Sequence, residues 1–296
     1  MAKPEQPRAA DTSKPKPKKS GLKPDVATAA GIVLALAGIL GGLILEKGQI
    51  QDIVQGTAAM IVLGGTFGAV LITNPLPVVI RAFRGLSKVF MEQASSTPET
   101  IESLIQYATK ARKNGIVSLE AEAAAIPDPF LRKALGLAVD GTDLQELRKM
   151  METDIVLAEQ AIESEAKVWE AAGGYAPTVG IIGAVLGLIQ VMKHLEDIKE
   201  VGHGIAVAFV ATVYGVGTAN ILFLPMANKI RSRLRAASLL QEMTLEGVIG
   251  IVEGLNPTLI RLKLNSYDDQ PKAKEAKSKV ARNSKPAAAP KAASAA

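Results

Sequence analysis

The sequence contains no cysteine, and aromatic residues make up only 4% of it. The absence of cysteine excludes disulfides, thiolate metal sites and a cysteine nucleophile. Hydrophobic residues nevertheless reach 48%, and the chain holds 26 glycines. A composition rich in small apolar residues and poor in aromatic ones is typical of membrane helices, whose backbones approach closely where side chains are small.

Charged residues are missing from four long stretches: Val26–Leu45, Ile53–Ile80, Ala171–Met192 and Gly204–Asn228. About 20 helical residues cross a hydrocarbon layer of about 30 Å, and every stretch is at least that long. The stretches form two pairs separated by a charged insert, so the sequence predicts four membrane-spanning helices. Because no acidic side chain lies inside them, a mobile ion handled here needs a carboxylate from elsewhere.

The distribution of basic residues predicts the orientation in the membrane. They gather in the N-terminal tail and directly after the second and fourth stretches: Lys14, Lys16, Lys18, Lys19, Lys23, Arg81, Arg84, Lys88, Lys229, Arg231, Arg233 and Arg235. The positive-inside bias then places both termini and the insert on the cytoplasmic side of the bilayer. The net charge of +5 does not indicate nucleic acid binding, because no basic surface interleaved with aromatic residues is present.

The predicted fold class is an all-α membrane protein with a helical cytoplasmic insert between its second and third transmembrane helices. The third and fourth helices are expected to extend into the cytoplasm. The predicted segments are a disordered basic tail (1–24), the four spans (25–46, 53–73, 171–193 and 204–226), the insert (74–170), a cytoplasmic helix (227–267) and a second disordered tail (268–296).

Local signals predict helices within the insert. Thr97-Pro98-Glu99 combines a hydroxyl N-cap, a proline in the first turn and an acid at the positive end of the helix dipole. This helix is expected to stop at Asn114-Gly115. Shorter helices follow, one around Leu119 and another from Asp128. The run 142–170 lacks proline and glycine, so it is expected to continue into the third span as one helix.

Within the third and fourth spans, prolines and hydroxyls are the candidate functional groups. Pro177 and Pro225 each remove one intrahelical hydrogen bond, which either bends the helix for packing or frees a carbonyl towards a cavity. Thr178 and Thr212 either line an ion path or bond their own helix backbone. The sequence shows no metal-ligand spacing, no nucleophile–base set and no phosphate loop, so an enzyme is not indicated.

Several segments resemble the MotA/PomA family, the A subunits of bacterial flagellar stators. The matching segments are Tyr175–Ile189 (YAPTVGIIGAVLGLI), Ala211–Gly215 (ATVYG), Leu222–Lys229 (LFLPMANK), Asp25–Gly31 (DVATAAG) and Ala111–Glu120 (ARKNGIVSLE). The order of elements and the loop lengths also agree with the family. The resemblance covers about residues 24–265.

The resemblance implies a multi-pass protein of the bacterial inner membrane, with five copies around two copies of a MotB/PomB-type partner. That partner supplies the membrane aspartate, and ion flow turns the ring to drive the rotor protein FliG. By resemblance, Pro177 and Pro225 take part in ion-coupled movement, and Thr212 lies beside the ion path. Arg112 and Glu120 match charges that engage the rotor, with Lys113 as their neighbour. No cofactor is implied.

The same resemblance bears on the transported ion. Sodium-driven members typically carry a threonine where this chain has Ala184, and a methyl group cannot ligate a hard cation, which prefers oxygen. Protons are therefore favoured over sodium. The alternative function is that of the ExbB/TolQ type, which energises outer-membrane processes. Those proteins usually have three spans and an N-terminus outside the cytoplasm.

Overall fold

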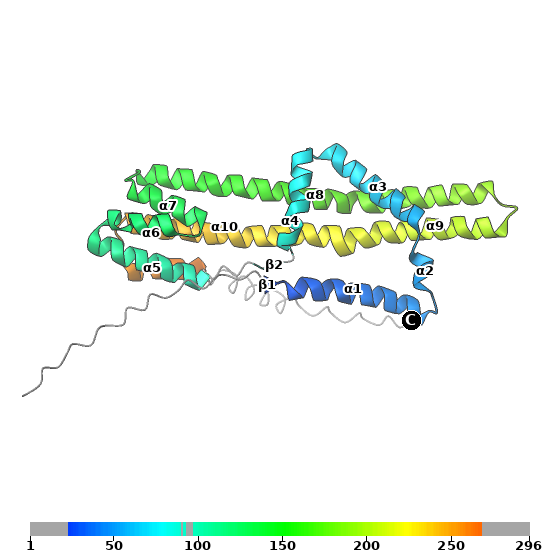
Figure 1. The fold of residues 1–296 in the computed structure, drawn as a ribbon, viewed down its shortest axis with the longest axis horizontal. Coiled ribbons are helices and arrows are strands. Elements are labelled where there is room, and N and C mark those ends of the chain that lie inside the picture. Colours follow the sequence, from blue (N-terminus) through cyan, green and yellow to red (C-terminus); the bar gives the residue numbers. More distant parts are fainter. Residues whose placement is uncertain (1–22, 90, 93–96, 268–296) are drawn as a thin grey trace, which may run out of the picture.

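The computed structural model describes residues 23–89, 91–92 and 97–267, and these are almost entirely helical (Figure 1). The helices are α1 (Val26–Leu45), α2 (Ile50–Ile53), α3 (Gly56–Thr73), α4 (Leu76–Val89), α5 (Thr97–Asn114), η1 (Ile116–Leu119), α6 (Glu120–Ala125), α7 (Pro129–Val139), α8 (Leu144–Lys193), α9 (Ile198–Gly217), η2 (Thr218–Phe223) and α10 (Leu224–Val252). Residues 257–267 form a further helical stretch. Two-residue strands, β1 (Lys23–Pro24) and β2 (Met91–Glu92), pair antiparallel.

Two long antiparallel helices organise the molecule. The first is α8, of 50 residues, and the second is the continuous run of α9, η2 and α10 over 55 residues (Figure 1). A helix of 50 residues is about 75 Å long, more than twice the hydrocarbon thickness. The spans and their extensions out of the membrane are therefore single helices, as the sequence predicts. Asp143 caps α8 by accepting hydrogen bonds from the backbone N–H groups of Gln145 and Glu146.

The insert forms a compact helical domain at one end of these two helices. There α5, η1, α6 and α7 pack against the start of α8 and the end of α10. The largest fully buried side chains of this core are Leu104, Leu119, Leu135, Leu147, Met151, Met243, Ile249, Ile260 and Leu264. Burying each such side chain contributes about 1.5–3 kcal/mol, so this domain has a hydrophobic core of its own.

The helices α1, α3 and α4 differ in how they contact the long helix pair. Both α8 and α9 are contacted by α3, whereas α1 has no buried residue (Figure 1). After Pro75 the chain turns, and α4 crosses α8 and α10 instead of running along them. Four helices of the described chain are long and apolar enough to span a membrane, which confirms the predicted number.

The boundaries differ from the prediction in two places. The second span begins at Gly56, because residues 50–53 form the separate short helix α2. The helix expected over 227–267 is interrupted after Val252, where Gly254 adopts a left-handed backbone (φ 69°) that favours glycine. The predicted disordered tails lie outside the described residues, apart from Lys23 and Pro24.

Candidate ion-path and coupling site

Glycines hold α8 and α9 in close contact along their membrane portions. A Cβ atom added at Gly215 would lie 2.5 Å from the backbone oxygen of Ala176, and one at Gly187 would lie 2.8 Å from the backbone nitrogen of Ala208. Gly180, Gly183 and Gly204 face the opposite helix equally closely. We call these five residues the glycine seam. It confirms the close backbone approach expected from a composition rich in small residues.

Both prolines interrupt the hydrogen bonding of continuous helices. Pro177 lies inside α8, one residue beyond the buried Ala176. Pro225 follows η2, a π-helical segment over Thr218–Phe223 that joins α9 to α10. A π-helix has a wider turn, and such segments occur often at functional sites. Because Pro225 has no N–H group, the carbonyl of Ile221 lacks its usual helical donor. The sequence therefore predicts an interrupted helix at this point, but it does not predict that the interruption is π-helical.

Three threonine hydroxyls of the third and fourth spans are bonded to their own helices. Thr178 Oγ1 donates to the backbone oxygen of Tyr175 (2.8 Å), and Thr212 Oγ1 donates to that of Ala208 (3.2 Å). Thr218 Oγ1 does the same towards Tyr214 (2.6 Å). Both threonines identified from the sequence, Thr178 and Thr212, therefore bond the backbone of their own helix. A donor hydroxyl still keeps acceptor lone pairs on its oxygen.

Tyr214 ties the fourth span to the start of the second. Its hydroxyl donates to the backbone oxygen of Ile53 (2.5 Å) and accepts from the backbone N–H of Gln55 (3.3 Å). The two bonds satisfy backbone groups between α2 and α3 that would otherwise need partners. No local sequence pattern indicates this role, because the contact joins residues more than 150 positions apart.

An aromatic cluster lies where α3, α4, α8 and η2 meet, and no sequence pattern predicts it either. It consists of Phe67, Phe83, Trp169 and Phe223. The ring centroid of Trp169 lies 4.9 Å from that of Phe83 and 6.1 Å from that of Phe223. Phe67 contacts both phenylalanines. Such ring pairs add about 0.5–1.5 kcal/mol each beyond area burial. The cluster thereby fixes the π-helical segment against its neighbours.

A buried carboxylate attaches α1 to α10. The side chain of Asp25 is only 8% exposed, and it pairs with Lys229 (2.5 Å) and Arg233 (2.9 Å). It also caps α1 by accepting from the backbone N–H of Thr28. The hydrogen bond from Lys229 and that from Thr28 hold the pKa of Asp25 well below its usual range. Lys229, identified from sequence only as an orientation signal, thus also has a structural partner.

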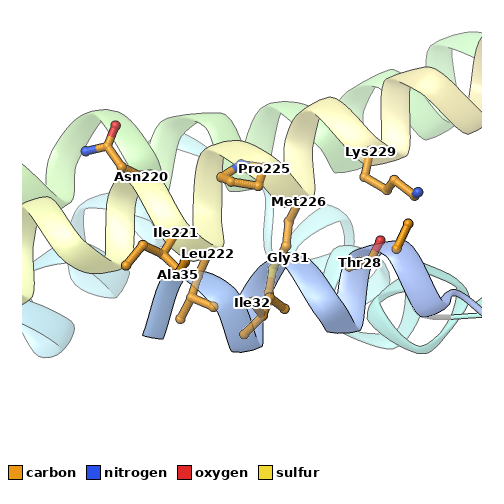
Figure 2. Close-up of a pocket in the computed structure, with 11 residues that line it drawn as sticks. Thr28, Gly31, Ile32, Ala35, Asn220, Ile221, Leu222, Pro225, Met226 and Lys229 are labelled. Atoms are coloured by element: carbon orange, nitrogen blue, oxygen red, sulfur yellow. The ribbon is translucent and has the colours of Figure 1, made fainter. Parts of the chain in front are cut away.

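A cavity of about 320 Å³ separates α1 from η2 and the start of α10 (Figure 2). Apolar side chains of both helices line it, among them Ile32, Leu222 and Met226, and Lys229 lies at one end. Pro225 also lines the cavity and is exposed. The helix interruption at Pro225 therefore borders open space and not a packed interface on this side.

The three charges expected to contact a rotor lie on the surface of the insert. Arg112 and Lys113 are exposed in the last turn of α5, and Glu120 is exposed at the start of α6. An ion pair between Lys110 and Glu122 (2.6 Å) joins these two helices. Arg112 also lines a second cavity of about 370 Å³, between the ends of α5, α7 and α10. Within the described ranges, no cluster of acidic or histidine side chains could hold a metal ion.

Two family matches divide the chain. Residues 29–115 match the family described as Motility protein A N-terminal, and residues 122–243 match the MotA/TolQ/ExbB proton channel family. Motility protein A of Helicobacter pylori (strain ATCC 700392 / 26695) is 35% identical, over 82% of this chain and 95% of the relative. The chain belongs to the motility protein A family. The second family includes TolQ and ExbB as well as motility proteins, but the N-terminal match is to motility proteins, so it favours a motility protein over the ExbB/TolQ alternative.

Solved structures of stator complexes share the fold of this motility protein A family member. The structure of C. jejuni MotAB matches with a TM-score of 0.79 and 32% sequence identity, covering 82% of this chain and 95% of that one. The flagellar MotAB stator complex from Bacillus subtilis matches with a TM-score of 0.76 and 33% identity, covering 81% and 95%. The long helix pair and the insert are therefore family features.

Proposed function

We propose that the chain is the A subunit of a flagellar motor stator and that it couples inward proton flow to torque. The single observation that carries this proposal is the pair of acid-free spans in α8 and α9–α10, joined along the glycine seam and interrupted at Pro177 and Pro225. Its likeness to the MotAB complexes supports a MotB/PomB-type partner and a homo-oligomeric ring, for which we propose five copies around two.

The partner is proposed to supply the carboxylate that carries the ion. A charge at the centre of a bilayer costs several kcal/mol unless it is paired or hydrated, and the stretches 26–45, 53–80, 171–192 and 204–228 contain no charged side chain. In this arrangement α8 and α9 form a weakly polar wall against which a carboxylate on another chain can move. The activity breaks no covalent bond, so we propose no enzymatic role.

Protons are the proposed coupling ion. Ala184 lies half-buried on α8 and offers only a methyl group, which cannot ligate a cation. A sodium ion, in contrast, requires several oxygen ligands in place of its hydration shell. A proton needs only one titrating group on the partner.

Swimming speed tests the ion. Cells that lack stators and receive this chain with its B-type partner should swim equally fast with and without sodium at one fixed pH. A protonophore should stop them. Speed that rises with sodium would overturn the choice of ion but leave the stator proposal intact, whereas no swimming with a functional partner present would overturn the stator proposal.

The proposed location is the bacterial inner membrane, with both termini and the insert in the cytoplasm. Arg112, Lys113 and Glu120 would then face the rotor protein FliG from the surface of the insert. A tag on residue 1 should be protected from protease in intact spheroplasts and cleaved after lysis. Cleavage in intact spheroplasts would instead favour the topology of the ExbB/TolQ type.

A further inference from the structure

One amphipathic helix lies across the bundle at the level where the membrane spans end. Pro75 follows the second span, and α4 starts at the next residue, crossing α8 and α10 (Figure 1). On α8 its crossing point is marked by Trp169, whose ring contacts that of Phe83 on α4. Trp169 is two residues before the uncharged stretch that begins at Ala171. This helix therefore runs in the plane of the bilayer surface on the side of the insert.

The surface of α4 is divided into faces. Val79 and Ala82 are buried and turn towards the bundle. Leu76, Ile80 and Phe83, spaced at i, i+4 and i+7, share a neighbouring face and are 59%, 41% and 46% exposed. Such a row of exposed large apolar side chains is unfavourable in water. Arg81 and Arg84 lie on the next face around the helix and are exposed.

This arrangement matches the interface of an anionic membrane. A helix lying in the interface buries its apolar face among the acyl chains and keeps basic side chains at the level of the headgroups. The guanidinium group of arginine binds phosphate oxygens through two parallel hydrogen bonds. Each basic residue near an anionic leaflet strengthens the attraction about fivefold.

We propose that α4 is a lipid-binding element that inserts Leu76, Ile80 and Phe83 into the leaflet on the insert side and binds the phosphates of anionic phospholipids through Arg81 and Arg84. Aromatic contacts link this element to the coupling site, because Phe83 touches Trp169 and Trp169 stacks on Phe223 of the π-helical segment. The proposal does not depend on the transported ion or on the rotor contact.

The single tryptophan of the chain makes the binding measurable. The full-length chain is reconstituted into vesicles whose phospholipids carry bromine near the top of the acyl chain, and tryptophan quenching is recorded. Brominated phosphatidylglycerol is compared with brominated phosphatidylcholine at equal mole fractions. We expect a local preference of about fivefold or more for the anionic lipid around Trp169, decreasing as salt is added.

Matched variants assign the preference to α4. Arg81→Gln and Arg84→Gln together should bring the two lipids close to equal quenching, whereas Lys149→Gln, an exposed cation elsewhere on α8, should leave the preference unchanged. Ile80→Asn should reduce quenching by both lipids. An unchanged emission spectrum and elution volume verify folding of each variant.

Three outcomes would overturn the proposal. The first is equal quenching by the two lipids in the parent protein, and the second is a preference that survives the double arginine variant. The third is weak quenching by both lipids that Ile80→Asn does not alter, which would mean that another protein surface covers this face of α4.

Discussion

Replacing Gly215 by alanine should force α8 and α9 apart at the closest point of the glycine seam. The added Cβ would lie 2.5 Å from the backbone oxygen of Ala176 and 3.0 Å from the Cα atom of Gly180, whereas ordinary van der Waals contact begins near 3.4 Å. The obstructing atoms are backbone, so no side-chain rotation relieves the clash. The two helices must separate and lose contact along the seam.

The magnitude follows from a comparison within the same helix. Forcing one methyl group into a packed site costs about 1–3 kcal/mol. Alanine also favours the helix over glycine by up to about 1 kcal/mol. A Cβ atom added at Gly217, on the same helix, would meet nothing within 4 Å, so Gly217→Ala keeps the helix gain and avoids the clash. The two variants should therefore differ in stability by about 1–3 kcal/mol.

The assay is the thermal stability of the purified full-length protein in detergent, followed by tryptophan fluorescence and by elution on size exclusion. Gly215→Ala should unfold at a lower temperature than the parent, and Gly217→Ala should equal or exceed the parent. Gly187→Ala and Gly174→Ala form a second pair, because Gly174 also has free space around it. Equal stability within both pairs would refute the close approach of the two helices.

Three further predictions concern the coupling elements. Pro177→Ala and Pro225→Ala each return a backbone donor to the helix, so they should abolish swimming while co-purification with the B-type partner persists; normal swimming would exclude a role for these prolines. Charge reversal at Arg112 or Glu120 should impair swimming more than proton flux, and an equal loss of both would place the rotor contact elsewhere. Asp25→Asn should increase proteolysis at the start of α1, because it weakens the pairs with Lys229 and Arg233. The pKa of Asp25 is depressed in the folded protein, so the ionised carboxylate stabilises the fold at pH values above its ordinary pKa of 3.8, and this stabilisation is lost as the pH falls below 3.8. The variant and the parent should therefore differ in proteolysis at neutral pH and converge only in strong acid.

The elements that the sequence predicts correctly are those with local causes. Spans follow from hydropathy over 20 residues, and the start of α5 at Thr97 and its end at Asn114 follow from capping signals within a few positions. The unbroken passage of α8 from the insert into the membrane follows from a run without proline or glycine before residue 171. The predicted segment 227–267 passes over the break at Gly254, although Gly254 and Pro257 lie only three positions apart, a spacing typical of a turn.

The features that the sequence does not show depend on contacts between distant residues. The hydroxyl of Tyr214 reaches a backbone oxygen 161 positions away, and Asp25 pairs with Arg233, which is 208 positions away. No local pattern predicts that Phe67, Phe83, Trp169 and Phe223 meet, because the four residues come from four different helical segments. The sequence identifies Thr178 and Thr212 as candidates, but only the structure shows that their hydroxyls bond their own helices.

Under the proposed function, the two prolines, the cavity beside Pro225 and the glycine seam explain how the passage of one ion can bend such long helices. A membrane potential of 100 mV supplies about 2.3 kcal/mol per charge. A backbone hydrogen bond contributes about 0.5–1.5 kcal/mol net, so bending an intact helix by breaking two or three bonds would consume that energy. At Pro177 and Pro225 one such bond is already absent, and the cavity beside Pro225 gives the helix space on that side. The glycine seam resists separation of the two helices, so movement is directed into bending at the prolines.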